Sequence, residues 1–450
     1  LDVPYPFPLD YGEGVALDRC VGLLHGEPLY PAVGRPPFIT WNFPPLYMWV
    51  CALAARAVGP SFAVGRTVSL LAALAAAVLV GLLASRGGVS RFWAVVAGLL
   101  FVGTCTVATW GALMRVDMLG VAFGLVGLVC VASRRPAWQA GTAFGLAFLC
   151  KQSLFAALAA SLLWLAHSRR WREGLWVAAV GGLVGGGVLA LLWLVVGPPL
   201  WTHLFTANMN DWSVRQLVWE TLRFGRGAAV LGVMVAAGWA AAPRCYRPGL
   251  PACYLLCAAA AGLLAGKAGA GDNYFLDITA ALAIAGAGGA ENVVRALSAR
   301  GRAARGVALA AVLLVAHVAL AAPFRQAGWH PRTPYLRAAA PLLISARAPV
   351  VSDDPGLVVA VGKRLWFQPF EFTQMAVAGK WDQSPMLDAL RRGEVPLIAI
   401  HFNAWDPSAR DAAGTWESGA FTDEMVQAIR GRYRPTHRAG PLWILQPAPP

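Results

Sequence analysis

Long apolar segments separated by short polar turns occupy most of the chain up to residue 322. Ten of these segments approach the ~20 apolar residues that a helix needs to cross a membrane. In chain order they are Phe62–Ser85, Phe92–Leu113, Met118–Ser133, Trp138–Cys150, Ser153–His167, Gly174–Gly197, Gly227–Ala242, Leu250–Ala265, Tyr274–Gly289 and Gly306–Ala322. A further segment, Pro44–Gly59, opens with two prolines and contains Arg56, which predicts an interfacial helix on the membrane surface. The pattern is typical of a polytopic α-helical membrane protein.

Arginine residues gather in every second turn between these segments, and the intervening turns contain few basic residues. The basic set consists of Arg86, Arg91, Arg134, Arg135, Arg169, Arg170, Arg172, Arg244, Arg247, Arg295, Arg300, Arg302 and Arg305. Because basic loops stay on the cytoplasmic side, we expect the other turns, the first 61 residues and everything after Ala322 on the outer side. The chain opens with a polar, Pro-rich stretch, so we also expect a further span before Leu1.

The segment after Ala322 has a different character. Short apolar runs predict strands at Pro349–Ser352, Leu357–Val361, Val395–Phe402 and Leu442–Gln446, and helical periodicity predicts helices at Met386–Arg392 and Asp423–Arg432. We therefore expect three parts: an outer first loop with a juxtamembrane helix (1–61), a transmembrane helical domain (62–322) and a small extracytoplasmic α/β domain (323–450).

Composition supports a membrane protein. Hydrophobic residues make up 58% of the 450 residues and charged residues only 13%, against roughly a quarter in soluble domains, which excludes an ordinary soluble enzyme. The formal net charge of +14 would suit nucleic acid, but the basic residues lie in short loops, so we expect no nucleic-acid partner. The seven histidines are scattered and the eight cysteines show no zinc-binding spacing, so no metal site is predicted.

Most unusual polar residues fall in the outer loops, beginning with two carboxylates. Asp10 and Glu13 lie three positions apart, and a carboxylate in this place could act as a general base on an acceptor hydroxyl or amine. The alternative is a solvated turn in which Asp10 caps the backbone. Further along, Asn42 lies in an aromatic segment, Trp41–Tyr47, that also suits a membrane interface.

Three charged residues stand at the outer ends of apolar segments. Arg115 and Asp117 lie two positions apart, and Lys151 precedes Gln152. An ionised group at membrane depth costs ~2.5–3.5 kcal/mol, so it is tolerated where it faces water, a partner or a cavity. Arg115 and Asp117 either form a mutual ion pair or face a binding site. Lys151 has no acidic residue nearby in sequence and is a candidate phosphate contact.

A glycine-rich turn at 266–274 contains another lone lysine. Backbone N–H groups of such a turn can bind phosphate, but the P-loop spacing is missing and a plain interhelical turn would look the same. Asp277, one helical turn later, is a further carboxylate within a span. The candidate residues of the turn are Lys267, Asp272, Asn273 and Tyr274.

In their order and on one side of the membrane, these motifs resemble those of the GT-C glycosyltransferases. The similarity is to bacterial relatives of the dolichyl-phosphate-mannose protein mannosyltransferases and of the lipid A aminoarabinose transferase (glycosyltransferase families 39 and 83), and it covers about residues 1–322. The motifs are Asp10 with Glu13, Asn42–Tyr47, Val64–Ser69 around Arg66, Met114–Asp117, Cys150–Ser153 and Gly271–Phe275. Many relatives have adjacent Asp and Glu, whereas two residues intervene here.

The resemblance implies a GT-C-like fold and inverting transfer of a sugar from a polyprenyl-phosphate donor to an envelope lipid, glycan or protein. The reaction would take place on the outer face of a bacterial cytoplasmic membrane. It further implies that Asp10 is the base and that Glu13 is a second acid that positions the acceptor or a divalent cation. A third set of residues would contact the donor. Those contacts would come from Asn42, Arg115, Asp117, Lys151, Gln152, Lys267, Asp272, Asn273 and Tyr274.

Two other classes of protein compete with this interpretation. A transporter or flippase of a lipid-linked glycan would also be polytopic, but transporters bind substrate near the midplane and often contain repeats, neither of which is visible here. A noncatalytic scaffold of an envelope assembly would keep the fold while the acidic motif does no chemistry.

Overall fold

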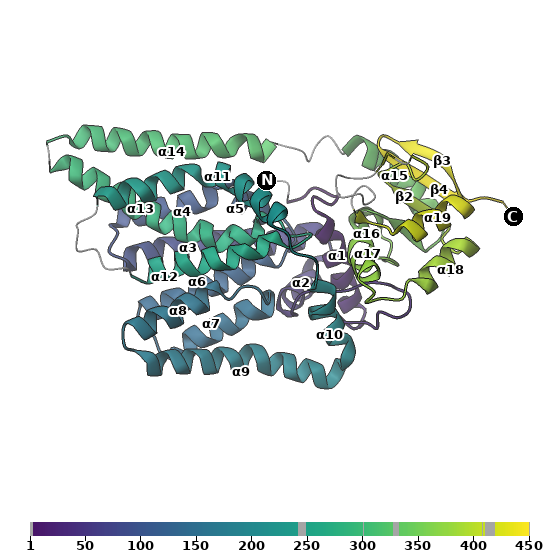
Figure 1. Cartoon of the computed structure of the whole chain (residues 1–450), viewed down its shortest axis with the longest axis horizontal. Helices are drawn as coiled ribbons and strands as arrows, with labels where there is room; N and C mark the ends of the chain where they lie inside the picture. The colour runs from purple at the N-terminus through teal and green to yellow at the C-terminus, as the bar shows by residue number, and fades with distance from the viewer. Residues whose placement is uncertain are drawn as a thin grey trace.

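The structure is a computed structural model that describes residues 3–241, 249–299, 301–326, 333–406, 408–409 and 419–449. A bundle of long helices forms one end of the molecule and a small domain with a sheet forms the other, with α1, α2 and α10 between them (Figure 1). The bundle contains α3 (Phe62–Arg86), α4 (Arg91–Gly103), α5 (Cys105–Trp110), α6 (Asp117–Ala132), α7 (Ala137–Cys150), α8 (Ala156–His167), α9 (Trp171–Val196), α11 (Val214–Ala241), α12 (Leu250–Gly262), α13 (Leu276–Ser298) and α14 (Ala303–Gln326).

Each of the ten predicted apolar segments overlaps one or more of these helices. Among the described residues, α3, α9 and α11 are long and apolar enough to cross a membrane by length and composition. The predicted segment Phe92–Leu113 is divided at Thr104, whose extended backbone separates α4 from α5 and whose Oγ1 donates to the Phe101 carbonyl at 2.7 Å. Arg244, Arg247 and Arg300 of the predicted inner loops lie outside the described residues.

The acidic motif begins a helix, which corrects the expectation of a loop there. α1 (Tyr11–Leu24) starts after Asp10, whose side chain accepts from the Gly12 N–H at 3.0 Å and so satisfies one of the unpaired donors of the first turn. A helix is also present where the interfacial one is predicted, as α2 (Leu46–Val58). The short α10 (Pro198–Leu204) and the 3-10 turns η1 (Thr206–Asn208), η2 (Leu263–Gly266) and η3 (Asp272–Phe275) complete this part.

The C-terminal part is a small α/β domain, as predicted. Its sheet has the order β1-β2-β4-β3, in which β1 and β2 are parallel and the other neighbours antiparallel. The elements are α15 (Thr333–Ser345), β1 (Val350–Ser352), α16 (Pro355–Ala360), α17 (Pro369–Val377), α18 (Ser384–Arg392), β2 (Leu397–Ile400), α19 (Asp423–Arg432), β3 (Tyr433–Ala439) and β4 (Leu442–Pro447).

One strand prediction in this domain is wrong. Leu357–Val361 was expected to be a strand, but most of it belongs to α16. Asp354 caps this helix by accepting from the Gly356 N–H at 3.0 Å, and Pro355 occupies the first helical position, where its missing N–H costs no hydrogen bond. Capping residues therefore outweigh the local β propensity.

The small domain contacts the rest of the chain mainly through α1 and α16, which approach closely at two glycines. A Cβ added at Gly14 would lie 2.2 Å from the Gly356 backbone nitrogen, and one added at Gly356 would lie 2.3 Å from the Pro8 Cβ. Only glycine at these two positions lets the two backbones meet, so the contact of α1 with α16 depends on them.

We predict that Gly14→Ala destabilises the protein, because the atom in the way is backbone and cannot rotate aside. The expected loss is about 1–3 kcal/mol, the usual range for an overpacked contact, measured as a fall in the free energy of unfolding. Gly34→Ala serves as the control, since no atom lies within 4 Å of a Cβ there. Equal stability of the two variants would contradict the close contact.

Candidate active site

A buried ion pair between Glu13 of α1 and Arg66 of α3 organises the end of the bundle that meets α1. Neither side chain is exposed. Arg66 Nε donates to Glu13 Oε1 at 2.8 Å and Nη2 to Oε2 at 2.7 Å, while Nη1 reaches the Tyr5 carbonyl at 2.6 Å. The same carboxylate accepts from the backbone N–H of Leu9 at 2.7 Å and of Met114 at 2.8 Å. Glu13 thus contacts the residue before Asp10 and the residue before Arg115.

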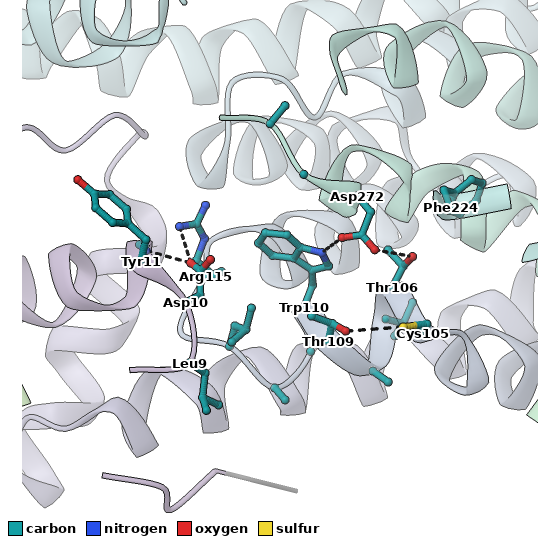
Figure 2. A pocket seen from close by; sticks show the side chains of 18 of the residues that line it. Leu9, Asp10, Tyr11, Cys105, Thr106, Thr109, Trp110, Arg115, Phe224 and Asp272 are labelled. Carbon is teal, nitrogen blue, oxygen red and sulfur yellow. Dashed lines mark hydrogen bonds and ion pairs between the residues drawn. The ribbon is translucent and has the colours of Figure 1, made fainter. Parts of the chain in front are cut away.

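Asp10 and Arg115 form a second ion pair, which faces a cleft (Figure 2). Arg115 Nη1 donates to Asp10 Oδ1 at 3.0 Å, with the two side chains 19% and 28% exposed, respectively. The guanidinium also lies over the Trp110 ring at 5.4 Å. Gly12 makes room for this arrangement, since a Cβ there would lie 1.5 Å from Arg115 Nη1. Asp10 is therefore both a helix cap and a carboxylate that opens to a cavity.

The cleft has a volume of about 1080 Å³ and a smaller pocket of about 100 Å³ adjoins it. Asp10 lines the cleft only, whereas Lys151, Lys267, Asn42, Asn273 and Tyr274 line the smaller pocket only. The residues common to both are Gly12, Arg115, Gly269, Ala270, Phe370 and Glu371. Arg115 therefore stands between a chamber that contains the carboxylate and one that contains two lysines.

Lys151 has an acidic partner that its sequence neighbourhood does not show. Its Nζ donates to Asp117 Oδ1 at 2.6 Å and lies 4.2 Å from the centre of the Tyr274 ring. Asn273 Nδ2 donates to the same Asp117 oxygen at 2.8 Å. The mutual pair of Arg115 with Asp117, one of the two options from sequence, is replaced by two crossed pairs, Arg115 with Asp10 and Lys151 with Asp117.

Lys267 and the amide residues surround the smaller pocket. Lys267 Nζ donates to the Asn208 carbonyl at 2.9 Å, and burial lowers the pKa of this lysine. Gln152 does not line either pocket; its Nε2 donates to the Asn42 carbonyl at 3.0 Å and holds that segment. Buried polar atoms without a hydrogen-bond partner among the described residues are concentrated here: Asn42 Oδ1, Arg115 Nε, Asp117 Oδ2, Gln152 Oε1 and Asn273 Oδ1.

The other candidate carboxylates lie apart from Asp10. Asp272 lines the cleft beyond Trp110, and its two oxygens accept from Trp110 Nε1 at 2.6 Å and Thr106 Oγ1 at 3.2 Å. Asp277 lines neither pocket and accepts from the Tyr254 hydroxyl at 2.5 Å. The structure thus brings Asp272 to the cleft and leaves Asp277 inside the helical bundle.

The C-terminal domain contributes residues that the sequence analysis missed. Phe370 and Glu371 of α17 line both pockets, and Asp353, which follows β1, lines the cleft. The Tyr11 hydroxyl donates to Glu371 Oε2 at 2.9 Å and accepts from the Phe370 N–H at 3.0 Å. Burial raises the pKa of both Tyr11 and Glu371. The Asp-Asp-Pro-Gly sequence after the predicted first strand was the one available signal, because it places a carboxylate at a strand end.

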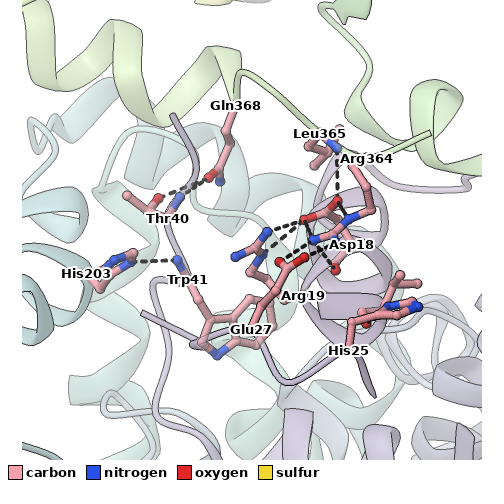
Figure 3. Close-up of polar contacts among 11 residues, drawn as sticks. Asp18, Arg19, His25, Glu27, Thr40, Trp41, His203, Arg364, Leu365 and Gln368 are labelled. Atoms are coloured by element: carbon pink, nitrogen blue, oxygen red, sulfur yellow. Dashed lines mark hydrogen bonds and ion pairs between the residues drawn. The ribbon is translucent and has the colours of Figure 1, made fainter. Parts of the chain in front are cut away.

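Two sets of polar contacts hold this domain over the site (Figure 3). Gln368 Oε1 accepts from the Thr40 N–H at 2.7 Å, which joins the domain to the segment before Asn42. His203 of α10 fixes the same segment, since its Nδ1 accepts from the Trp41 N–H at 2.9 Å. Burial lowers the pKa of His203 to about 4, so the ring is neutral and able to accept. The second set is centred on Arg364.

Arg364 joins the small domain to Asp18 of α1 and to Glu27, which follows α1. Its Nε donates to Asp18 Oδ1 at 2.8 Å, and its Nη1 and Nη2 donate to Glu27 at 2.5 and 2.8 Å. Burial alone would raise the pKa of Asp18, but hydrogen bonds from Arg364 and the charge of Arg19 lower it overall. The hydrogen bonds from Arg364 also lower the pKa of Glu27.

Comparison with known proteins comes from structure rather than sequence, since no protein-family profile and no curated protein matches the sequence. ArnT from Cupriavidus metallidurans, in the apo state, matches over 98% of this chain and 93% of its own, with a TM-score of 0.64 and 14% identity. ArnT bound to undecaprenyl phosphate matches over the same shares, with a TM-score of 0.64 and 15% identity.

A second neighbour is the archaeal oligosaccharyltransferase AglB from Archaeoglobus fulgidus, in complex with an inhibitory peptide and a dolichol-phosphate. It matches over 87% of this chain and 65% of its own, with a TM-score of 0.55 and 13% identity. Both neighbours have the GT-C fold, and this chain therefore has the GT-C fold of membrane glycosyltransferases, with a small C-terminal α/β domain.

A divalent cation near Asp10 and Glu13 was one option from the sequence, and one AglB structure is a complex with Zn and sulfate. Both Glu13 oxygens are occupied by Arg66 and by backbone N–H groups. In the described part of the chain, no three His, Cys, Asp or Glu side chains gather as metal ligands would. The described residues therefore do not fit a resident cation here.

We predict that Glu13→Gln destabilises the protein strongly, whereas Asp10→Asn does not. Removing one partner of a fully buried ion pair typically costs about 3–5 kcal/mol, because Arg66 is left with an uncompensated charge. The Asp10–Arg115 pair is partly exposed, and ion pairs open to solvent are worth about 0–1 kcal/mol. Unfolding of both variants in the same detergent measures the difference in the free energy of unfolding. Similar losses would show that the Glu13–Arg66 pair stabilises the protein no more than the Asp10–Arg115 pair.

We also predict that the Arg364 contact weakens in acid. A carboxyl whose pKa is lowered in the folded state stabilises the protein above its unfolded pKa, about 4 for Asp and Glu, and loses that contribution as the pH falls toward the folded pKa. The stability difference between the parent and Arg364→Met should therefore be full at pH 7 and shrink below about pH 4. A difference independent of pH would mean that the arginine acts through packing alone.

Proposed function

We propose that the protein is a glycosyltransferase that moves a sugar from a polyprenyl-phosphate donor to an envelope lipid, glycan or protein. The observation that carries this proposal is the Asp10–Arg115 pair, which stands where a cleft with a carboxylate meets a pocket with two lysines. The GT-C fold supports a lipid-linked donor, since the ArnT and AglB neighbours are seen with undecaprenyl phosphate and a dolichol-phosphate.

The acceptor enters the cleft, and its hydroxyl or amine attacks the anomeric carbon of the donor sugar. Asp10 takes the proton of the nucleophile as the new bond forms, which is the task of a general base. The bond to the lipid phosphate breaks on the opposite face of the sugar, and its electron pair leaves with the phosphate. This single displacement inverts the anomeric configuration and forms no covalent enzyme intermediate.

The lipid phosphate lies against Arg115 and the smaller pocket. Arg115 faces both chambers, so its guanidinium can offset the charge that develops on the leaving phosphate, and Lys267 adds a second cation. Lys151 is already neutralised by Asp117 and acts mainly by positioning the Tyr274 ring that it lies over. Asn273 is held by the same Asp117 oxygen. The unpartnered oxygens of Asn42 and Asn273 can accept from sugar hydroxyls.

Glu13 has a different task from the one expected of a second acid. With its oxygens occupied and no exposed surface, it is a positioning residue that holds Leu9 and Met114, and through them Asp10 and Arg115. The outer face of a bacterial cytoplasmic membrane is the proposed location, because the basic loops place Asp10 on that side.

The test is transfer of radiolabelled sugar from polyprenyl-phosphate donors in membranes that contain the full-length protein. We expect transfer by the parent and a fall of about 10²–10⁴-fold in Asp10→Asn, since the amide keeps the cap but cannot take a proton. The matched control is Asp382→Asn, an exposed carboxylate that likewise accepts from a backbone N–H, that of Ser384 at 2.9 Å.

Either of two results would count against the proposal. Asp10→Asn with parental activity would remove Asp10 as the base. Folded parent protein that transfers sugar from none of the donors would favour the transporter or flippase alternative, which uptake or flipping of the same labelled lipids would then detect.

A further inference from the structure

The cleft has a second polar end that the proposed glycosyl transfer does not use. Gln216, Glu220 and Arg223, from the first turns of α11, line it together with Asp272 and Thr106. In Figure 2, Trp110 lies between the Asp10–Arg115 pair and the side chains of Asp272 and Thr106. The two ends of the cleft are thus separate polar environments within one cavity.

Glu220 is the unusual residue at this end. It is only 5% exposed, yet its Oε2 has no hydrogen-bond partner among the described residues. Its Oε1 accepts from Gln216 Nε2 at 3.3 Å, a long hydrogen bond. Arg223, one turn further along α11, is exposed and leaves this oxygen without a donor.

The neighbouring Asp272 shows what a structurally satisfied carboxylate looks like in the same cleft. Both of its oxygens accept hydrogen bonds, from Trp110 and Thr106. A buried carboxylate oxygen without a donor is destabilising, and such atoms persist in folded proteins where a ligand or another function needs them. Glu220 therefore offers an unused acceptor inside a cavity large enough for substrate.

We propose that Glu220 binds a hydroxyl or ammonium group of a substrate head group at this end of the cleft. A carboxylate accepts hydrogen bonds only, so it selects donors and repels a phosphate. Phe224 adds an apolar wall near Asp272 and Thr106 (Figure 2), and Leu70 and Leu74 of α3 add apolar lining to the cleft, which suits an amphiphile. The inference rests on the proposed glycosyl transfer, in which the head group belongs either to the acceptor or to the donor sugar.

Steady-state kinetics of the full-length protein in lipid nanodiscs distinguish the two sources. We compare the parent with Glu220→Leu, which removes the acceptor atoms, and with Glu220→Gln, which keeps a neutral one. The control is Glu173→Gln, which lies far along the chain from the cleft residues and pairs with Arg170 at 2.6 Å.

Glu220→Leu should raise one KM at least tenfold and change kcat little. A raised KM for acceptor assigns the group to the acceptor, and a raised KM for donor assigns it to the donor sugar. Glu220→Gln should keep most of the affinity for a hydroxyl and lose it for an ammonium. If the parent transfers sugar and both KM values of Glu220→Leu stay within twofold of parental values, the inference is wrong while the proposed function stands. A parent without transfer overturns both.

A binding measurement needs no turnover. Cys105 lines the cleft beside Thr106, so its alkylation rate reports occupancy of this end. n-Octyl β-D-glucoside and n-octylamine should slow alkylation in the parent, and octanoate, whose head offers no hydrogen-bond donor at neutral pH, should not. In Glu220→Leu the concentration that gives half-protection should rise at least tenfold. Unchanged protection, or equal protection by octanoate, would overturn the role of Glu220.

Discussion

The buried pair of Glu13 and Arg66 is the contact on which the junction of α1 with α3 and the turn after α5 depends. The Glu13 carboxylate accepts four hydrogen bonds, two from Arg66 and two from backbone N–H groups. These bonds connect α1 to three segments: the chain before α1, the start of α3 and the turn after α5. Both ions are out of water, so their cost is offset only while every partner stays in place. Because Leu9 and Met114 are the neighbours of Asp10 and Arg115, the geometry of the Asp10–Arg115 ion pair follows from this one contact.

A second constraint is the space between the bundle and the C-terminal domain. Two glycines let α1 and α16 meet at backbone distance, and Gly12 leaves room for the Arg115 guanidinium. The small domain then supplies Phe370 and Glu371 as a wall common to the cleft and the smaller pocket. The domain therefore forms part of both cavities, and its attachment through Arg364 bears on their shape as well as on stability.

Charge distribution in the site follows a crossed pattern. Arg115 pairs with Asp10, and Lys151 pairs with Asp117, so two cations and two carboxylates neutralise one another across the boundary between the chambers. Lys267 stands beside them and donates to the Asn208 backbone carbonyl. This arrangement leaves the two ion pairs without net charge, and a phosphate-bearing donor, as proposed above, would bind by rearranging the partly exposed Asp10–Arg115 pair.

The sequence by itself determined the class of protein, the order of the helices and most candidate residues, because apolar length and lone charges at helix ends are local signals. Only the tertiary structure decided which charges pair. Asp117 and Lys151 lie 34 positions apart and Glu13 and Arg66 lie 53 apart, so no local pattern connects them. Packing of the C-terminal domain likewise brings Glu371 to the two pockets, since its hydrogen-bond partner Tyr11 lies 360 positions away in the sequence. The two carboxylates also differ in burial. Glu13 is enclosed and its oxygens are occupied, whereas Asp10 is open to the cleft.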